Sequence, residues 1–127
     1  MKEPGNFLDK IEQVLKENHQ YKFEAYSFVM AALHSTVSKF KKTRHVSGKE
    51  LLEGIRHYAI EQFGPLARTV LSYWGVHTTN DFGKIVFALV EAGILRKQAE
   101  DKIEDFSDVF NFQEAFARGF KLEDEEK

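Results

Sequence analysis

Residues 47–95, SGKELLEGIRHYAIEQFGPLARTVLSYWGVHTTNDFGKIVFALVEAGIL, decide the fold of this chain. Three segments follow one another in this stretch, each with apolar residues three or four positions apart. The breaks between the segments are Phe63-Gly64-Pro65 and the run 74–79. This order predicts a helix–helix–turn–helix core that is winged-helix-like. The core is an architecture and does not by itself give an activity.

Capping residues mark the first break and the start of the core. Ser47 and Glu50 stand three positions apart, as in a capping box, so the first core helix is expected to begin at Ser47. Gly64 suits the left-handed position that ends a helix, and Pro65 suits the first position of the next helix. Leu66 is expected on the inner face of that second helix. The same reasoning along the whole chain predicts helices at 7–17, 23–41, 47–63, 65–74, 79–91 and 112–120.

Residues 94–112 permit two structures. Ile94-Leu95 and the run 109–112 have the composition of two short strands, which would form a wing-like hairpin around the polar stretch 96–108. In the alternative, residues 98–105 form a helical turn. The expected fold class is therefore mainly α, a helical bundle with a winged-helix-like half and, in the first alternative, a short two-stranded β wing.

The length of 127 residues predicts one domain. Within a single helical domain at 1–121 we expect a two-helix N-terminal part at 6–42 and the winged-helix-like part at 47–120. Residues 122–127 are expected to form a disordered acidic tail. A hydrophobic content of 43% with 12 Phe is sufficient for an aromatic-rich core.

The composition also bears on compartment and membrane contact. The chain has no Cys, which rules out a disulfide or a thiolate metal site and fits a reducing cytoplasm, the expected location. No apolar stretch approaches the roughly 20 residues that span a bilayer, so no membrane interaction is expected. The N-terminal sequence MKEPGNFLDKIEQVL has no long uncharged run of the kind found in signal peptides.

Charge is distributed unevenly along the chain. Residues 1–97 contain 14 Lys and Arg against 10 Asp and Glu, whereas residues 98–127 contain 4 against 10. A basic run lies at 39–56 and offers candidate nucleic-acid contacts at Lys41, Lys42, Arg44 and Lys49. The plainer interpretation of this run is a solvated loop.

The helix expected at 79–91 occupies the position of a DNA-reading helix. Thr79, Asn80, Asp81 and Lys84 are among the residues expected on its outer face, and Lys84 is the candidate nucleic-acid contact there. One lysine beside acidic residues is a weak surface for phosphate. The helix-turn-helix pattern is therefore interpreted chiefly as a packing unit.

Three residues are candidate protein contacts. Tyr26 and Tyr73 lie off the main apolar stripes, and exposed tyrosines are frequent at binding hot spots. Gly83 lies in the first turn of its helix, where glycine costs about 1 kcal/mol relative to alanine. We expect Gly83 to admit the close approach of another helix or of a partner's backbone.

Catalytic, cofactor and metal sites are not indicated by any motif. Glu53 and His57, or His57 and Glu61, lie one helical turn apart and are the only arrangement singled out for proton exchange or metal sharing. A structural metal site normally gathers four ligands, so surface histidines are the preferred interpretation. We therefore assign no catalytic, cofactor-binding or metal-binding residue and expect no enzyme activity.

Several segments resemble a family of small bacterial proteins of unassigned activity, the planctomycete and verrucomicrobial conserved hypothetical family. The resemblance extends over about residues 20–117 and rests on the segments 25–29, 45–52, 62–67, 74–75, 79–87, 105–106 and 109–112. It implies a stand-alone bacterial cytoplasmic domain and transfers no site residue.

The leading expectation is a non-catalytic interaction or adaptor domain whose partner is another protein. The alternative is a nucleic-acid-associated protein that uses the basic run at 39–56. The identity of the partner, the oligomeric state and the presence of a ligand pocket are left open by the sequence.

Overall fold

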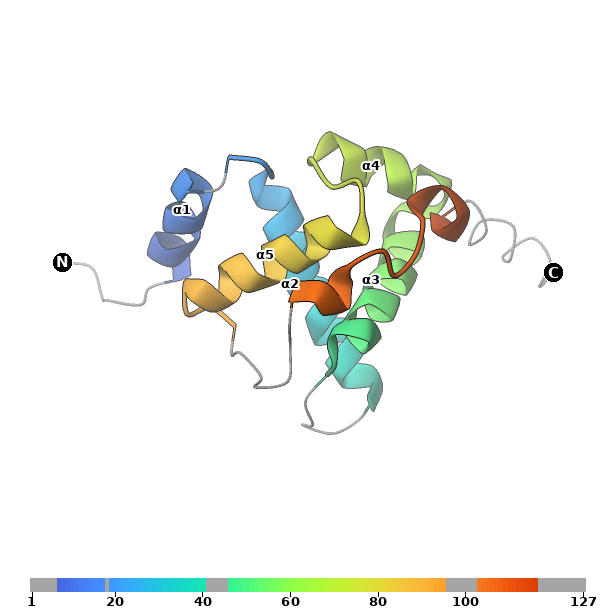
Figure 1. Cartoon of the computed structure of the whole chain (residues 1–127), viewed down its shortest axis with the longest axis horizontal. Helices are drawn as coiled ribbons and strands as arrows, with labels where there is room; N and C mark the ends of the chain where they lie inside the picture. Colours follow the sequence, from blue (N-terminus) through green and yellow to red (C-terminus); the bar gives the residue numbers. More distant parts are fainter. Residues whose placement is uncertain (1–6, 18, 41–45, 96–102, 117–127) are drawn as a thin grey trace.

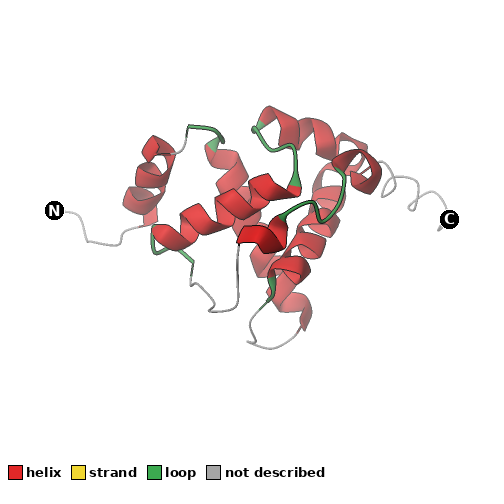
Figure 2. Ribbon diagram, in the orientation of Figure 1, coloured by secondary structure: helices red, strands yellow, loops and turns green. Residues whose placement is uncertain are grey.

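The chain is mainly helical in the computed structural model, which describes residues 7–17, 19–40, 46–95 and 103–116. Figure 2 shows helices joined by short loops, and no strand occurs within these ranges. Residues 112–116 are also helical. The labelled elements are α1 (Phe7–Glu17), α2 (Phe23–Phe40), α3 (Gly48–Phe63), the 3₁₀ turn η1 (Gly64–Leu66), α4 (Ala67–Tyr73), α5 (Thr79–Glu91) and the 3₁₀ turn η2 (Ile103–Phe106).

The cap at the start of α3 is the one that the sequence predicts. The Ser47 hydroxyl accepts a hydrogen bond from the Glu50 N–H at 3.1 Å, and Glu50 Oε1 accepts one from the Ser47 N–H at 3.0 Å. Gly64 ends the helix with φ of +55°. Pro65 then falls in η1, one turn before α4 begins. The two capping predictions are therefore confirmed, and the second core helix begins later than expected.

A β wing is absent from the described part of residues 94–112. The N–H groups of Ile94 and Leu95 both donate to the Leu89 carbonyl, at 2.9 and 3.2 Å, and so complete the end of α5 instead of pairing with a strand. Val109 donates its N–H to Thr79 Oγ1. The 3₁₀ turn η2 overlaps the end of the stretch 98–105, for which the alternative predicts a helical turn, and residues 98–102 lie outside the described residues.

The core is built around α2, which packs against both α3 and α5. In Figure 1, α5 crosses the middle of the molecule in front of α2, and η2 lies beside α5. None of the described helices combines the length and the apolar character needed to cross a bilayer. The largest fully buried side chains are Tyr26, Leu52, Ile55, Leu71, Val76, Thr79, Phe82, Ile85, Leu89 and Phe106 with Val29.

Two expectations about side-chain placement are wrong. Leu66 is 61% exposed, because Ala67 and Leu71, four residues apart on α4, take the inner positions. Tyr26 is fully buried, because α2 is covered on two sides and not along a single stripe. Tyr26 therefore belongs to the core and not to a contact surface.

Candidate protein-docking groove

An open groove of 270 Å³ lies where the first half of α2 faces the last turns of α3. Phe28, only 7% exposed, forms its floor. The Phe28 ring centroid lies 5.7 Å from that of Phe63 and 5.6 Å from that of Trp74. We call this site the aromatic groove, and its lining residues are Phe23, Glu24, Ser27, Phe28, Ala31, Tyr58, Gln62, Phe63 and Trp74.

The aromatic groove continues into exposed apolar surface. Phe23, at the start of α2, is 42% exposed, and Tyr73, at the end of α4, is 72% exposed. The Lys22 N–H donates to the Trp74 carbonyl at 3.1 Å, which places the two segments side by side. Lys22 Nζ lies 5.1 Å from the centroid of the Tyr73 ring, within the range of a cation–π contact.

Gly75 allows this close approach of the two segments. Its φ is +96°, and a Cβ atom at this position would overlap the carbonyl oxygen of Gln20. The residue after Trp74 must therefore be glycine for the chain to turn here. The position of the Trp74 ring at the end of the groove depends on this turn.

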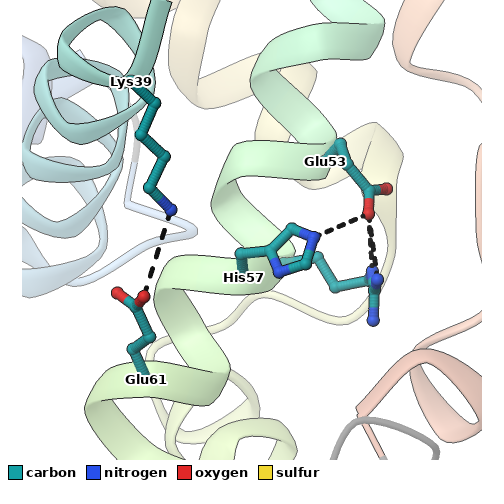
Figure 3. Close-up of polar contacts among 5 residues, drawn as sticks. Lys39, Glu53, His57 and Glu61 are labelled. Atoms are coloured by element: carbon teal, nitrogen blue, oxygen red, sulfur yellow. Dashed lines mark hydrogen bonds and ion pairs between the residues drawn. The ribbon is translucent and has the colours of Figure 1, made fainter.

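A polar cluster on α3 is the second group of candidate side chains. Glu53 Oε2 accepts hydrogen bonds from Arg56 Nε at 3.2 Å and Arg56 Nη2 at 2.9 Å, and His57 Nε2 lies 3.1 Å from it. His57 therefore pairs with Glu53 and not with Glu61. Glu61 lies instead 4.0 Å from Lys39 of α2 (Figure 3).

The charges of this cluster largely satisfy one another. Partial burial acts to raise the pKa of Glu53, but the hydrogen bond and positive charge of Arg56, with those of His57, hold it below its ordinary value. A carboxylate held ionised beside a cation is a poor general acid. No group of three or more His, Cys, Asp or Glu side chains is arranged to hold a metal ion in the described part of the chain.

The first turn of α5 is enclosed by the segment that follows η2. Thr79 is fully buried and donates its hydroxyl to the Phe106 carbonyl at 2.6 Å. Asn80 donates to Ser107 Oγ and accepts from the Asp108 N–H, both at 3.2 Å. The expectation that Thr79 and Asp81 face outward is wrong, since both are buried by contacts made within the chain.

Gly83 lies directly beneath η2. A Cβ atom at this glycine would lie 2.8 Å from the Cβ of Phe106, closer than real side chains approach. The close approach expected at Gly83 is therefore made by the chain's own η2 turn, and no surface remains there for a partner's backbone. Of the candidate protein contacts, only Tyr73 is exposed.

Two of the five candidate nucleic-acid contacts lie within the described residues. Lys49 and Lys84 are exposed on α3 and α5. Lys41, Lys42 and Arg44 lie outside the described residues, as does the expected tail at 122–127. The aromatic groove was not predicted, although Phe63 and Trp74 each stand immediately before a glycine that ends a helix. That pattern places two large rings at helix ends, where neighbouring turns cover them only in part.

The comparisons with known proteins add no relative. No family model, no curated protein and no solved structure matches this chain. Any function proposed for this chain therefore has to be argued from the geometry of the aromatic groove, the α3 cluster and the first turn of α5.

Proposed function

We propose that this chain is a non-catalytic interaction domain that binds another protein through the aromatic groove and Tyr73. The observation that carries the proposal is an open groove walled by Phe63 and Trp74 beside a tyrosine that is 72% exposed. Tyr and Trp supply a large share of the binding energy at protein interfaces. Exposed apolar surface next to a concave site is typical of docking surfaces.

The alternative, nucleic-acid association through the basic run at 39–56, receives less support. Lys39 is paired with Glu61 and Arg56 with Glu53, so two of the described cations face carboxylates. The α5 residues nearest to its N-terminus, which would read bases in a winged-helix protein, are bonded to residues 106–108. We therefore propose that the succession α3–α4–α5 is a winged-helix-like packing unit that serves protein binding. We also propose a cytoplasmic location, which the Cys-free composition supports, and membership of the small bacterial family that the sequence resembles.

Site-specific photo-crosslinking tests the proposal. A benzophenone amino acid replaces Tyr73 in one variant and Lys84, on the exposed side of α5, in a matched control. After irradiation in the cells that make the protein, the Tyr73 variant is expected to give a discrete protein adduct that survives nuclease treatment. The Lys84 variant is expected to give none. Adducts that are the same at both positions, or that disappear with nuclease, would contradict protein docking at this groove.

A further inference from the structure

The chemistry of the aromatic groove indicates which side chain of a partner it receives. Aromatic rings form its floor and walls, and Glu24 is the single charged residue among the described residues that line it. Glu24 is exposed in the first turn of α2 and has no ion-pair partner among the described residues. Among the described residues, no lysine or arginine lines the groove. The described lining therefore combines π faces with one carboxylate that has no cation beside it.

The surface next to the groove already binds a cation in this way. Lys22 Nζ lies 5.1 Å from the centroid of the Tyr73 ring, and Tyr73 directly precedes Trp74. The ring quadrupole attracts a cation to its face, with Trp the strongest of the three aromatic side chains. The Trp74 ring, which faces Phe28 and Phe63, offers the same chemistry inside the groove, and none of the described lining residues supplies a cation to it.

We propose that the aromatic groove receives an arginine side chain carried by an apolar segment of the partner protein. Arginine fits better than lysine because its planar guanidinium stacks on rings and donates two parallel hydrogen bonds to a carboxylate. The apolar neighbours of the arginine would cover Phe23, which lines the groove, and Tyr73, which directly precedes Trp74, and both of these side chains are exposed. This inference rests on the proposed function, because it assumes that the groove is the docking site.

Other occupants fit the groove less well. A wholly apolar segment would remove water from Glu24 without giving it a partner, which is costly for a carboxylate. An acidic segment would be repelled by the same carboxylate.

Trp74 is the only Trp of the chain, so its fluorescence reports directly on the aromatic groove. The probes are two amidated nine-residue peptides, acetyl-GSALRLASG and the same peptide with citrulline, the neutral isostere of arginine, in place of Arg. We expect the arginine peptide to change Trp74 emission with a Kd about fivefold below that of the citrulline peptide. In Glu24→Gln this ratio is expected to fall to about twofold, the part that the rings supply. In Glu91→Gln, a control at the exposed end of α5, it should stay at the wild-type ratio. Melting curves confirm that each variant is folded.

Three results would overturn the inference. Equal affinity for the two peptides in the wild type would show that the groove takes apolar segments. No change in Trp74 emission with either peptide would show that the groove takes neither. An emission change that depends on protein concentration without peptide would show that a second copy occupies it. Each of these results leaves a nuclease-resistant Tyr73 crosslink unaffected, so failure of the arginine inference is distinguishable from failure of the proposed function.

Discussion

The hydroxyl of Tyr21 donates a hydrogen bond to Asp81 Oδ1 at 2.5 Å, and this bond joins the segment before α2 to the first turn of α5. Asp81 Oδ2 accepts from the N–H groups of His77 and Thr78 at 2.8 and 3.1 Å. Gln20 Nε2 adds a longer contact of 3.4 Å to Oδ1. Asp81 is 7% exposed, so this buried carboxylate is satisfied by donors from two segments that lie about sixty residues apart.

Removing the Tyr21 hydroxyl tests this link. Tyr21→Phe keeps the ring but leaves Asp81 Oδ1 with only the distant Gln20 donor. We expect the free energy of unfolding to fall by about 1.5–3 kcal/mol, the usual worth of a hydrogen bond to a charged group. Urea denaturation measures this value. Tyr73→Phe, at an exposed tyrosine, is the control and should stay within about 0.5 kcal/mol of the wild type. A loss for Tyr21→Phe no larger than the control's would contradict the role given to this bond.

The same tyrosine gives the protein a dependence on alkaline pH. Burial, with the hydrogen bond to Asp81 and its negative charge, raises the pKa of Tyr21, and burial also raises the pKa of Tyr26. The unfolded chain releases these protons near pH 10 while the folded chain keeps them. Stability is therefore fully present below about pH 10 and is lost as the pH rises above it.

The slope of stability against pH checks the assignment to Tyr21. Each tyrosine that stays protonated in the folded state lowers the free energy of unfolding by about 1.4 kcal/mol for every pH unit above its unfolded pKa. In Tyr21→Phe the decline between pH 10 and 11.5 is expected to be shallower by about this amount, while Tyr73→Phe keeps the wild-type slope. Identical slopes in the two variants would show that Tyr21 ionises as readily in the folded chain as in the unfolded one.

Phe106 is expected to be among the largest single contributors to stability. Its ring lies against α3, where a Cβ at Gly48 would stand 3.2 Å away, and its Cβ lies against Gly83 of α5. Phe106 is 2% exposed, and its ring meets that of Phe87 edge to face. Phe106→Ala should lower the free energy of unfolding by about 3–5 kcal/mol because it leaves a cavity between the two helices. Val109→Ala, at a residue 37% exposed, should cost less than about 1 kcal/mol, and equal losses would show that η2 is not packed as described.

The cluster on α3 is expected to change the pKa of Glu53 and to contribute little to the free energy of unfolding. Because Arg56 and His57 outweigh partial burial and lower the pKa of Glu53, Arg56→Gln is expected to raise that pKa toward its ordinary value. Carboxyl ¹³C shifts recorded from pH 2 to 7 measure the change. The stability that Glu53 gives is present above the unfolded pKa of about 4.3 and is lost as the pH falls. Glu53 is 55% exposed, so solvent screening keeps this effect below about 1 kcal/mol. An unmoved Glu53 titration would contradict the pairing.

The helices were predictable from sequence because local signals mark their ends. α1 and α5 span the predicted residues, and the capping box at Ser47 sets the start of α3. Periodicity, however, assigns one buried stripe to each helix. It failed for Tyr26, since α2 is covered by two helices, and for Leu66, since η1 changes the helical phase just before α4.

Contacts between distant segments were not predictable in this way. Thr79 is polar and lies at a helix start, so it was expected outside, but its hydroxyl meets the Phe106 carbonyl 27 residues later. The aromatic groove likewise forms from α2, α3 and the turn at Trp74, whose pairing no local pattern specifies. Tyr73, which the apolar pattern of its helix places off the main stripe, is 72% exposed, and its role as a protein contact stays a prediction.

The crossing of α2 and α3 depends on Gly54. Replacing this glycine with alanine is expected to destabilise the protein, although alanine is ordinarily the better residue inside a helix. A Cβ at Gly54, in the middle of α3, would overlap Oγ1 of Thr36 and lie 2.9 Å from its Cβ. Thr36 is buried, and its hydroxyl donates to the Ala32 carbonyl at 2.8 Å, so the side chain is held in place. Alanine ordinarily stabilises a helix interior by about 1 kcal/mol relative to glycine. Gly54→Ala is expected instead to destabilise the protein by about 1–3 kcal/mol, the cost of overpacking.

A double-mutant cycle separates this clash from any other effect of the alanine. Thr36→Ala removes Oγ1, so Gly54→Ala should cost less in the Thr36→Ala background than in the wild type. Relief is expected to be partial because the residue-36 Cβ, 2.9 Å from the new methyl, remains. We expect a coupling free energy of about 0.5–2 kcal/mol from urea unfolding of the four proteins. Additive losses would mean that the two helices do not cross at Gly54 and Thr36, and the wall that α3 gives to the aromatic groove would then be in a different place.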